Sequence, residues 1–132
     1  MEKIYRIISR WWPAFVWMTV IFFFSSRHSV SVSPEYWLNF LFFKTLHLIE
    51  YAVLFTLLSR ATQSHLKAFI VTVLYAMTDE LHQQFVPSRE GKPRDVIIDA
   101  IGAGLTWYYL VKLLPKAPKV LKDLVRNLDV PF

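Results

Sequence analysis

The residues best able to do chemistry are polar and ionisable side chains inside, or at the ends of, long apolar segments. They are Lys44, His47, Glu50, Asp79, Glu80, His82, Gln83, Arg89, Arg94, Asp95 and Asp99. A charge at the centre of a membrane-spanning helix costs at least about 2.5–3.5 kcal/mol, so such groups should face each other or a wet cavity. All of them except His82 form the predicted ligand-binding set.

Proton transfer is the first chemistry that these residue types allow. A carboxyl group removed from water, or an imidazole near neutral pH, can act as a general acid or base. The candidate catalytic residues are therefore Glu80, His82 and His47.

Binding of a charged headgroup is the second kind of chemistry that these residue types allow. Lys44, Arg89 and Arg94 could clamp a phosphate or carboxylate, and arginine does so through two parallel hydrogen bonds. The predicted partners are membrane lipids, in particular an anionic lipid headgroup or a lipid-tailed ligand.

Serine and metal chemistry are not predicted. Serines and a histidine follow the first apolar segment, at Ser25, Ser26, His28 and Ser29. Nothing there marks a nucleophile elbow. The spacings His47-x-x-Glu50 and Glu80-x-His82 match no established metal-site signature, so no metal and no cofactor is expected.

Each polar residue also has a purely structural explanation. The long side chain of Lys44 could reach the membrane interface. His47 and Glu50 could form interhelical hydrogen bonds, and Glu80 could pair with a nearby arginine at a helix end.

The elements that must position these residues are helices. Apolar residues make up 55% of the chain, concentrated in blocks of the length that crosses about 30 Å of hydrocarbon. We predict one all-α domain over residues 1–132, a polytopic membrane helical bundle. Its four transmembrane helices are expected at residues 4–24, 38–58, 66–85 and 96–114, and a C-terminal amphipathic helix at 119–128.

Other classes of protein fit less well. A soluble helical bundle would need more polar surface than these blocks provide. The net charge of +5 comes from basic residues at block ends rather than along one stripe, so no nucleic acid is expected. The chain has no cysteine, which excludes disulfides, thiolate nucleophiles and Cys-type zinc sites.

Orientation follows from the basic residues, which are more frequent on the side that holds both termini. The positive-inside bias predicts cytoplasmic termini. Three helices then bring their polar residues to one outward-facing half. On the fourth, Asp95, Asp99 and Gly102 form a stripe, and Gly102 would let a neighbouring helix or a ligand approach closely.

The same residues resemble a known family. Residues 44–51 (KTLHLIEY), 79–89 (DELHQQFVPSR) and 94–102 (RDVIIDAIG) are similar to the VanZ-like family of bacterial membrane proteins, and the resemblance extends over residues 12–114. It implies a multi-pass protein of the bacterial cytoplasmic (inner) membrane that acts at the cell envelope. The family takes its name from a protein associated with low-level teicoplanin resistance. Asp99 departs from the asparagine that the family commonly has there.

Three hypotheses follow. The first is an envelope protein that binds an anionic lipid, a lipid-linked precursor or a lipoglycopeptide-like amphiphile in an outward-facing polar cavity. The second is an intramembrane acid-base enzyme that modifies an envelope lipid. The third is a small scaffold whose polar residues only hold the helices together. The small residues Ala100 and Gly104 also permit an oligomer.

Overall fold

The computed structural model describes residues 1–27, 34–87, 89 and 91–132. These residues form helices and connections, and no strand is found among them. His28 and Ser29, considered above for serine chemistry, lie outside the described residues. The prediction of an all-α protein is therefore confirmed.

Four long helices are followed by shorter pieces. Their bounds are α1 Glu2–Ser25, α2 Tyr36–Thr62, α3 His65–Gln83, α4 Pro93–Tyr108, the π-helical turn η1 Tyr109–Leu113, the 3₁₀ turn η2 Leu114–Lys116, and α5 Lys119–Asn127. Local chemistry explains several ends. The Ser64 side chain accepts the Lys67 N–H and caps α3, Gln63 ends α2 in the left-handed conformation at φ 53°, and Pro93 begins α4.

Three helices, rather than the four predicted, are long and apolar enough to cross a membrane by composition. They are Glu2–Ser25, Tyr36–Thr62 and Pro93–Lys116. The exception is α3, which ends at Gln83 and carries Lys67, Asp79 and Glu80 within 19 residues. The predicted third span ran to residue 85, two residues beyond the end of this helix.

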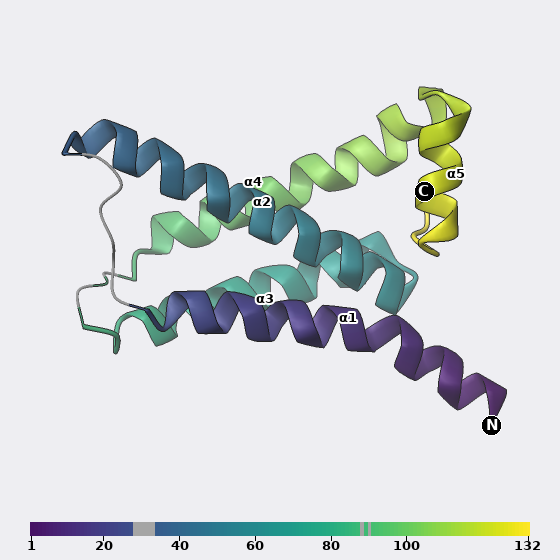
Figure 1. Ribbon diagram of the computed structural model, residues 1–132, viewed down its shortest axis with the longest axis horizontal. Helices are drawn as coiled ribbons and strands as arrows, with labels where there is room; N and C mark the ends of the chain where they lie inside the picture. The colour runs from purple at the N-terminus through teal and green to yellow at the C-terminus, as the bar shows by residue number, and fades with distance from the viewer. Residues whose placement is uncertain (28–33, 88, 90) are drawn as a thin grey trace.

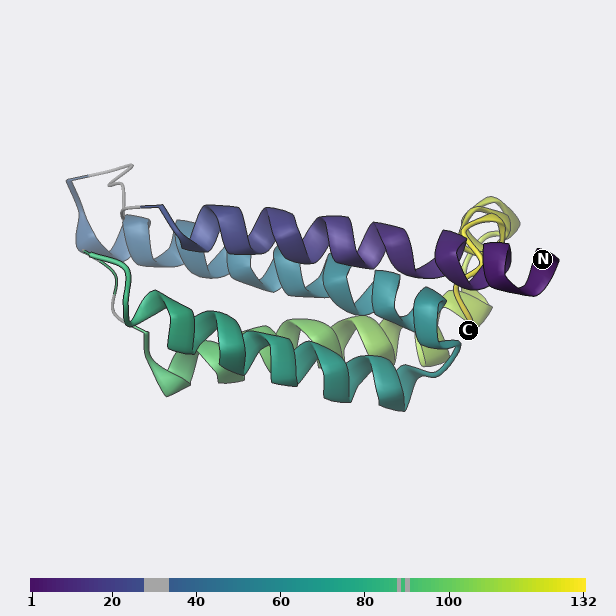
Figure 2. The same cartoon turned by 90° about the horizontal axis from the view of Figure 1, so that it is seen from below.

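The long helices form two layers, α1 beside α2 and α3 beside α4 (Figure 2). Both chain termini lie at one end of the molecule, here called the terminal end, together with the α2–α3 turn (Figure 1). The opposite end, here called the connection end, carries the links from α1 to α2 and from α3 to α4.

The helices α2 and α4 cross near the middle of the molecule and diverge toward the connection end (Figure 1). At the crossing, a Cβ atom on Gly102 would lie only 2.8 Å from the backbone oxygen of Leu48. The close approach expected at Gly102 is therefore made by the backbone of α2.

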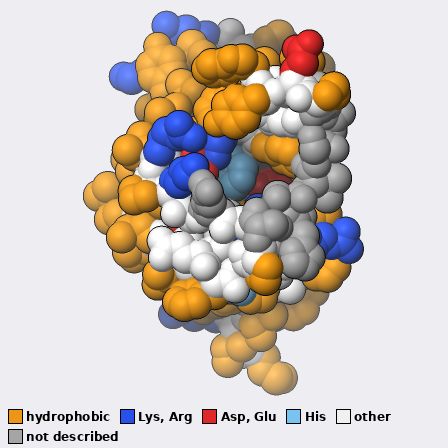
Figure 3. Space-filling view, turned by 90° about the vertical axis from the view of Figure 1, so that its left-hand side faces the viewer, with side chains coloured by type: hydrophobic (Ala, Val, Ile, Leu, Met, Phe, Trp, Pro, Cys, Tyr) orange, Lys and Arg blue, Asp and Glu red, His pale blue; other side chains and the backbone are white. Residues whose placement is uncertain are grey.

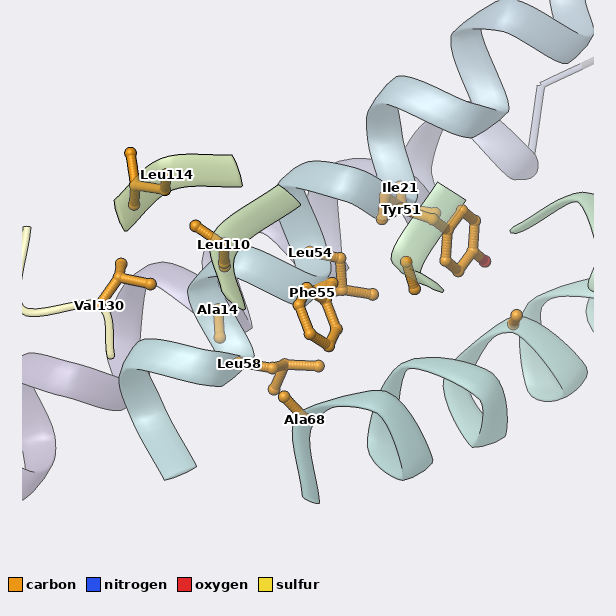
Figure 4. Packing of buried hydrophobic residues seen from close by; sticks show 12 residues of the cluster. Ala14, Ile21, Tyr51, Leu54, Phe55, Leu58, Ala68, Leu110, Leu114 and Val130 are labelled. Atoms are coloured by element: carbon orange, nitrogen blue, oxygen red, sulfur yellow. The ribbon is translucent and has the colours of Figure 1, made fainter. Parts of the chain in front are cut away.

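The apolar core fills the other half of the bundle. Tyr51, Leu54, Phe55 and Leu58 of α2 are fully buried and pack with residues of the later helices, such as Leu110 (Figure 4). Because fully buried apolar side chains exclude water, this core closes the bundle on the terminal side of its polar half.

The chain after η2 folds back across the terminal end, where α5 lies across the direction of the long helices (Figure 1). Asp129 then accepts a 2.6 Å hydrogen bond from Arg10 Nε in α1, and its backbone oxygen accepts one of 2.9 Å from Gln63. Val130 is buried beside this contact. The predicted C-terminal helix is present and is tied to the start of α1 and the end of α2.

Candidate functional site

Two ionisable pairs bridge α2 and α4 on the connection side of their crossing. Lys44 Nζ lies 2.5 Å from Asp95 Oδ2, and His47 Nδ1 lies 3.3 Å from Asp99 Oδ1. The spacings Lys44 to His47 and Asp95 to Asp99 are about one helical turn, which places the pairs on successive turns of both helices. With Arg94, these residues are called the α2–α4 site below.

A hollow opens at the connection end of the molecule (Figure 3). Lys and Arg side chains lie at one side of it, and a histidine and an acidic side chain are visible in its depth. This is the arrangement expected of the α2–α4 site, since α2 and α4 diverge toward this end.

The mouth of the site gathers two cations on one aromatic ring. Lys44 Nζ lies 5.8 Å and Arg94 Cζ 5.2 Å from the centre of the Phe40 ring, distances at which a cation and a ring attract each other. Arg94 Nε is also 3.8 Å from Asp95 Oδ1. Among the ion pairs of the described residues, both cations therefore share the carboxylate of Asp95.

Deeper in the site, polar atoms are buried without a hydrogen-bond partner. They are His47 Nδ1, Asp95 Oδ1 and Asp99 Oδ1. The last lies 3.3 Å from His47 Nδ1, so the two groups form an ion pair when the imidazole is protonated. Asp99 is only 1% exposed. Because buried polar groups are normally paired, these atoms mark a place for a further donor.

Asp79 joins three helices instead of lining this site. Its Oδ2 atom accepts hydrogen bonds from Ser25 Oγ of α1 at 2.8 Å, from Gln83 Nε2 at 3.0 Å and from the Tyr51 hydroxyl of α2 at 3.5 Å. Ser25 and Tyr51 were not in the predicted set. The position of Tyr51, one turn after His47 on the same face of α2, was the available signal.

Glu80 holds the connection between α3 and α4. Its Oε1 atom accepts the Lys92 backbone N–H at 2.9 Å. Gly91 lies against the same turn, and a Cβ atom there would meet the Glu80 backbone oxygen at 2.2 Å. The suggested pairing of Glu80 with an arginine is not found among the described contacts.

Arg89 and His82 fasten the end of α1. Arg89 donates from Nε to the Arg27 carbonyl at 2.9 Å and from Nη2 to the Phe24 carbonyl at 3.0 Å. His82 Nε2 lies 3.0 Å from Ser26 Oγ, and its ring stacks on Phe22 with centroids 4.4 Å apart. These contacts occupy the guanidinium and imidazole groups that the sequence suggested for a ligand or for catalysis.

Glu50 lies between the α2–α4 site and the residues around Asp79. Its backbone oxygen accepts the Trp17 indole N–H at 2.9 Å. Its half-buried carboxyl interacts electrostatically with His47, Asp79 and Asp99.

The predicted residues thus divide by what they contact. Lys44, His47, Arg94, Asp95 and Asp99 meet in the α2–α4 site, whereas Asp79, Glu80, His82, Gln83 and Arg89 contact α1 or the α3–α4 connection.

In the part of the chain that the structure describes, no three His, Asp or Glu side chains are grouped to hold a metal ion.

A model of the VanZ/LLP1 family matches residues 10–114 of the chain. This range includes most of α1, all of α2, α3 and α4, and every residue of the α2–α4 site. Searches of curated proteins and of solved structures find no match.

Proposed function

Since the chain belongs to the VanZ/LLP1 family and has helices able to cross a membrane, we propose that this VanZ-type envelope protein binds an amphiphile in the α2–α4 site. The amphiphile carries an acidic headgroup: an anionic lipid, a lipid-linked precursor or a lipoglycopeptide-like molecule. The headgroup enters the hollow between α2 and α4, and the lipid chains remain on the apolar outside.

The observation that carries this proposal is the pair of cations at the mouth. Lys44 and Arg94 lie on the same ring, that of Phe40, with Asp95 as their shared carboxylate. Of the described residues, this group carries two positive charges and one negative charge. A guanidinium can bind phosphate through two hydrogen bonds, and Arg94, with an exposed side chain, is free to turn toward one.

The membrane arrangement that fits this proposal has α3 as a fourth crossing. Its carboxyl groups do not face lipid, because Asp79 and Glu80 are only 3% and 4% exposed. Four crossings agree with both termini lying at one end (Figure 2). When the basic chain termini lie on the cytoplasmic side of a bacterial inner membrane, the hollow faces the outside of the cell.

Access from one side fits binding better than passage. The fully buried Tyr51, Leu54 and Phe55 lie beyond the site toward the terminal end. A headgroup entering the hollow would meet this apolar core and stop.

Native mass spectrometry of the purified protein tests the proposal. Arg94→Gln removes one mouth cation, and the double variant Lys44→Gln, Asp95→Asn removes the ion pair without leaving a lone charge. Both should lose acidic lipids that copurify with the wild type. Lys67→Gln, at the start of α3, is the matched control and should retain them.

Unchanged lipid adducts in both mouth variants would overturn the proposal. Loss of the adducts in the Lys67→Gln control as well would also overturn it, because retention would then reflect net charge rather than the α2–α4 site.

An acid-base enzyme is the second candidate, and one observation favours it. Asp99 Oδ1 lies beside His47 Nδ1, as a carboxylate that orients a general base does. This function requires that deletion of the gene alters the envelope lipids and that a His47→Gln copy fails to restore them. Restoration by that copy would exclude it.

A further inference from the structure

The charges of the α2–α4 site change sign with depth. At the mouth, Lys44 and Arg94 outnumber the one carboxylate between them. One turn deeper, Asp99 pairs with the imidazole of His47, and the carboxyl groups of Glu50 and Asp79 interact with it electrostatically. The turn that holds His47 and Asp99 is called the floor of the site below. A ligand with a single negative group would complement the mouth but not the floor.

Of the Asp, Glu, Lys, Arg and His side chains that the structure describes, those that are buried are all acids. They are Asp79, Glu80, Asp95 and Asp99. Asp79 accepts hydrogen bonds from three side chains, and Glu80 accepts a backbone N–H.

The two acids of α4 are the ones that face α2 in the site. Asp95 and Asp99, like Asp79 of α3, each keep a buried oxygen without a hydrogen-bond partner, and that oxygen of Asp99 lies 3.3 Å from His47 Nδ1 of α2. The floor of the site is thus rich in hydrogen-bond acceptors and short of donors.

We infer that the site takes a zwitterionic headgroup, with a phosphate at the mouth and a primary ammonium group at the floor. This inference rests on the proposed function and narrows its acidic headgroup to a phosphate that is accompanied by an ammonium group, in place of a headgroup with net negative charge. Lys44 and Arg94 bind the phosphate, and the ammonium donates an N–H bond to Asp99 Oδ1. A charged donor meeting a carboxylate in a water-poor site forms one of the stronger hydrogen bonds in proteins.

The depth of the site matches such a headgroup. Asp95 and Asp99 are four residues apart on α4, which is about 6 Å along a helix axis. A short aliphatic linker between phosphate and nitrogen spans that separation.

The number of N–H donors separates the ligand classes. A primary ammonium has three N–H donors, as a lysine ammonium does. A quaternary ammonium has the same charge and no N–H, and a glycerol headgroup has hydroxyl donors without positive charge. The floor should therefore distinguish phosphatidylethanolamine from phosphatidylcholine and phosphatidylglycerol.

The test presents these three lipids, in equal amounts, to the full-length protein and measures bound lipid by native mass spectrometry. The wild type should prefer phosphatidylethanolamine on the order of tenfold, the effect of one charge-assisted hydrogen bond. Asp99→Asn should reduce that preference to near parity while phosphatidylglycerol binding persists. The control Asp123→Asn, on α5, should leave the preference unchanged.

Equal binding of the three lipids by the wild type would overturn the inference and leave the proposed function standing, and this arm needs no variant to fold. An undiminished preference in Asp99→Asn would also overturn it. Failure of all three lipids to bind would contradict the proposed function itself. Soluble glycerophosphoethanolamine at equal concentration should not displace the lipid; complete displacement would overturn the lipid as the source of the headgroup.

Discussion

Asp79 is the residue on which the polar contacts of three helices meet. Its Oδ2 atom accepts from Ser25, Tyr51 and Gln83, and its side chain is buried. Removing a shared acceptor leaves several buried donors unpaired, which costs more than the loss of a single hydrogen bond. We therefore expect Asp79 to contribute to stability, at the edge of the proposed binding site.

Asp79→Ala should lower the stability of the protein in detergent. Each buried donor that loses its acceptor costs about 1–3 kcal/mol, although interhelical hydrogen bonds in membranes average nearer 0.6 kcal/mol. Thermal unfolding followed by tryptophan fluorescence measures the change, with Asp123→Ala on the exposed face of α5 as control. Equal melting temperatures for Asp79→Ala and the wild type would contradict the assignment.

The sequence predicted which residues are polar within the bundle, but not what each one contacts. Arg89 was expected to hold an anion, yet it binds backbone carbonyls 62 and 65 residues away in the chain. Helical spacing identifies the face on which a residue lies, whereas the neighbour across that face depends on how the helices pack. For Lys44 with Asp95, and for His47 with Asp99, spacing on two helices at once made convergence predictable.

At the scale of elements, the crossing of α2 and α4 creates the site. The two helices touch at Gly102 and separate toward the connection end. The side chains of the α2–α4 site fill the space between them. A larger residue at the crossing would move the helices apart and change the distance between the paired residues. Gly104, on the same helix, has ample space, since a Cβ there would be 3.9 Å from the nearest atom, in Phe69.

Gly102→Ala and Gly104→Ala should therefore have opposite effects on stability. Alanine in a helix interior is favoured over glycine by about 0.5–1 kcal/mol, so Gly104→Ala should be neutral or raise the melting temperature. At Gly102 the new methyl group would clash with the Leu48 backbone oxygen, and the melting temperature should fall. Similar shifts for the two variants would show that α2 and α4 do not meet at Gly102.

The bounds of the helices were predicted well where a hydrophobic block was long and uninterrupted. The prediction of a membrane span was less successful for α3, where apolar and charged residues are mixed. The start and end of α1 lie within two residues of the predicted bounds. For α3 the prediction rested on the apolar run, whereas the helix also carries Lys67, Asp79 and Glu80 and is not among the three helices that are apolar enough by composition. The π-helical turn at Tyr109–Leu113 has no sequence signal that we recognised.

At the scale of the whole molecule, the polar site and the basic termini lie at opposite ends. This separation is what allows a single orientation to place the site outside and the basic residues inside the cell. The structure places the two termini at the same end (Figure 1), and the charge bias supplies the proposed direction.

Cysteine labelling tests this orientation on a background with no native cysteine. A membrane-impermeant maleimide applied to intact cells should label Glu35→Cys, at the connection end, and should not label Lys3→Cys or Lys122→Cys. After permeabilisation all three should react, and the cysteine-free parent should never react. Labelling of Lys3→Cys in intact cells would reverse the orientation and place the hollow on the cytoplasmic side.

The contact of Asp129 with Arg10 and Gln63 also bears on biosynthesis. Asp129 follows every long helix along the chain, so all four of them have left the ribosome before this residue can reach α1. Chains fold progressively as they emerge during synthesis, and this ion pair can close only at the last stage. It would hold together a bundle whose helices were inserted one after another.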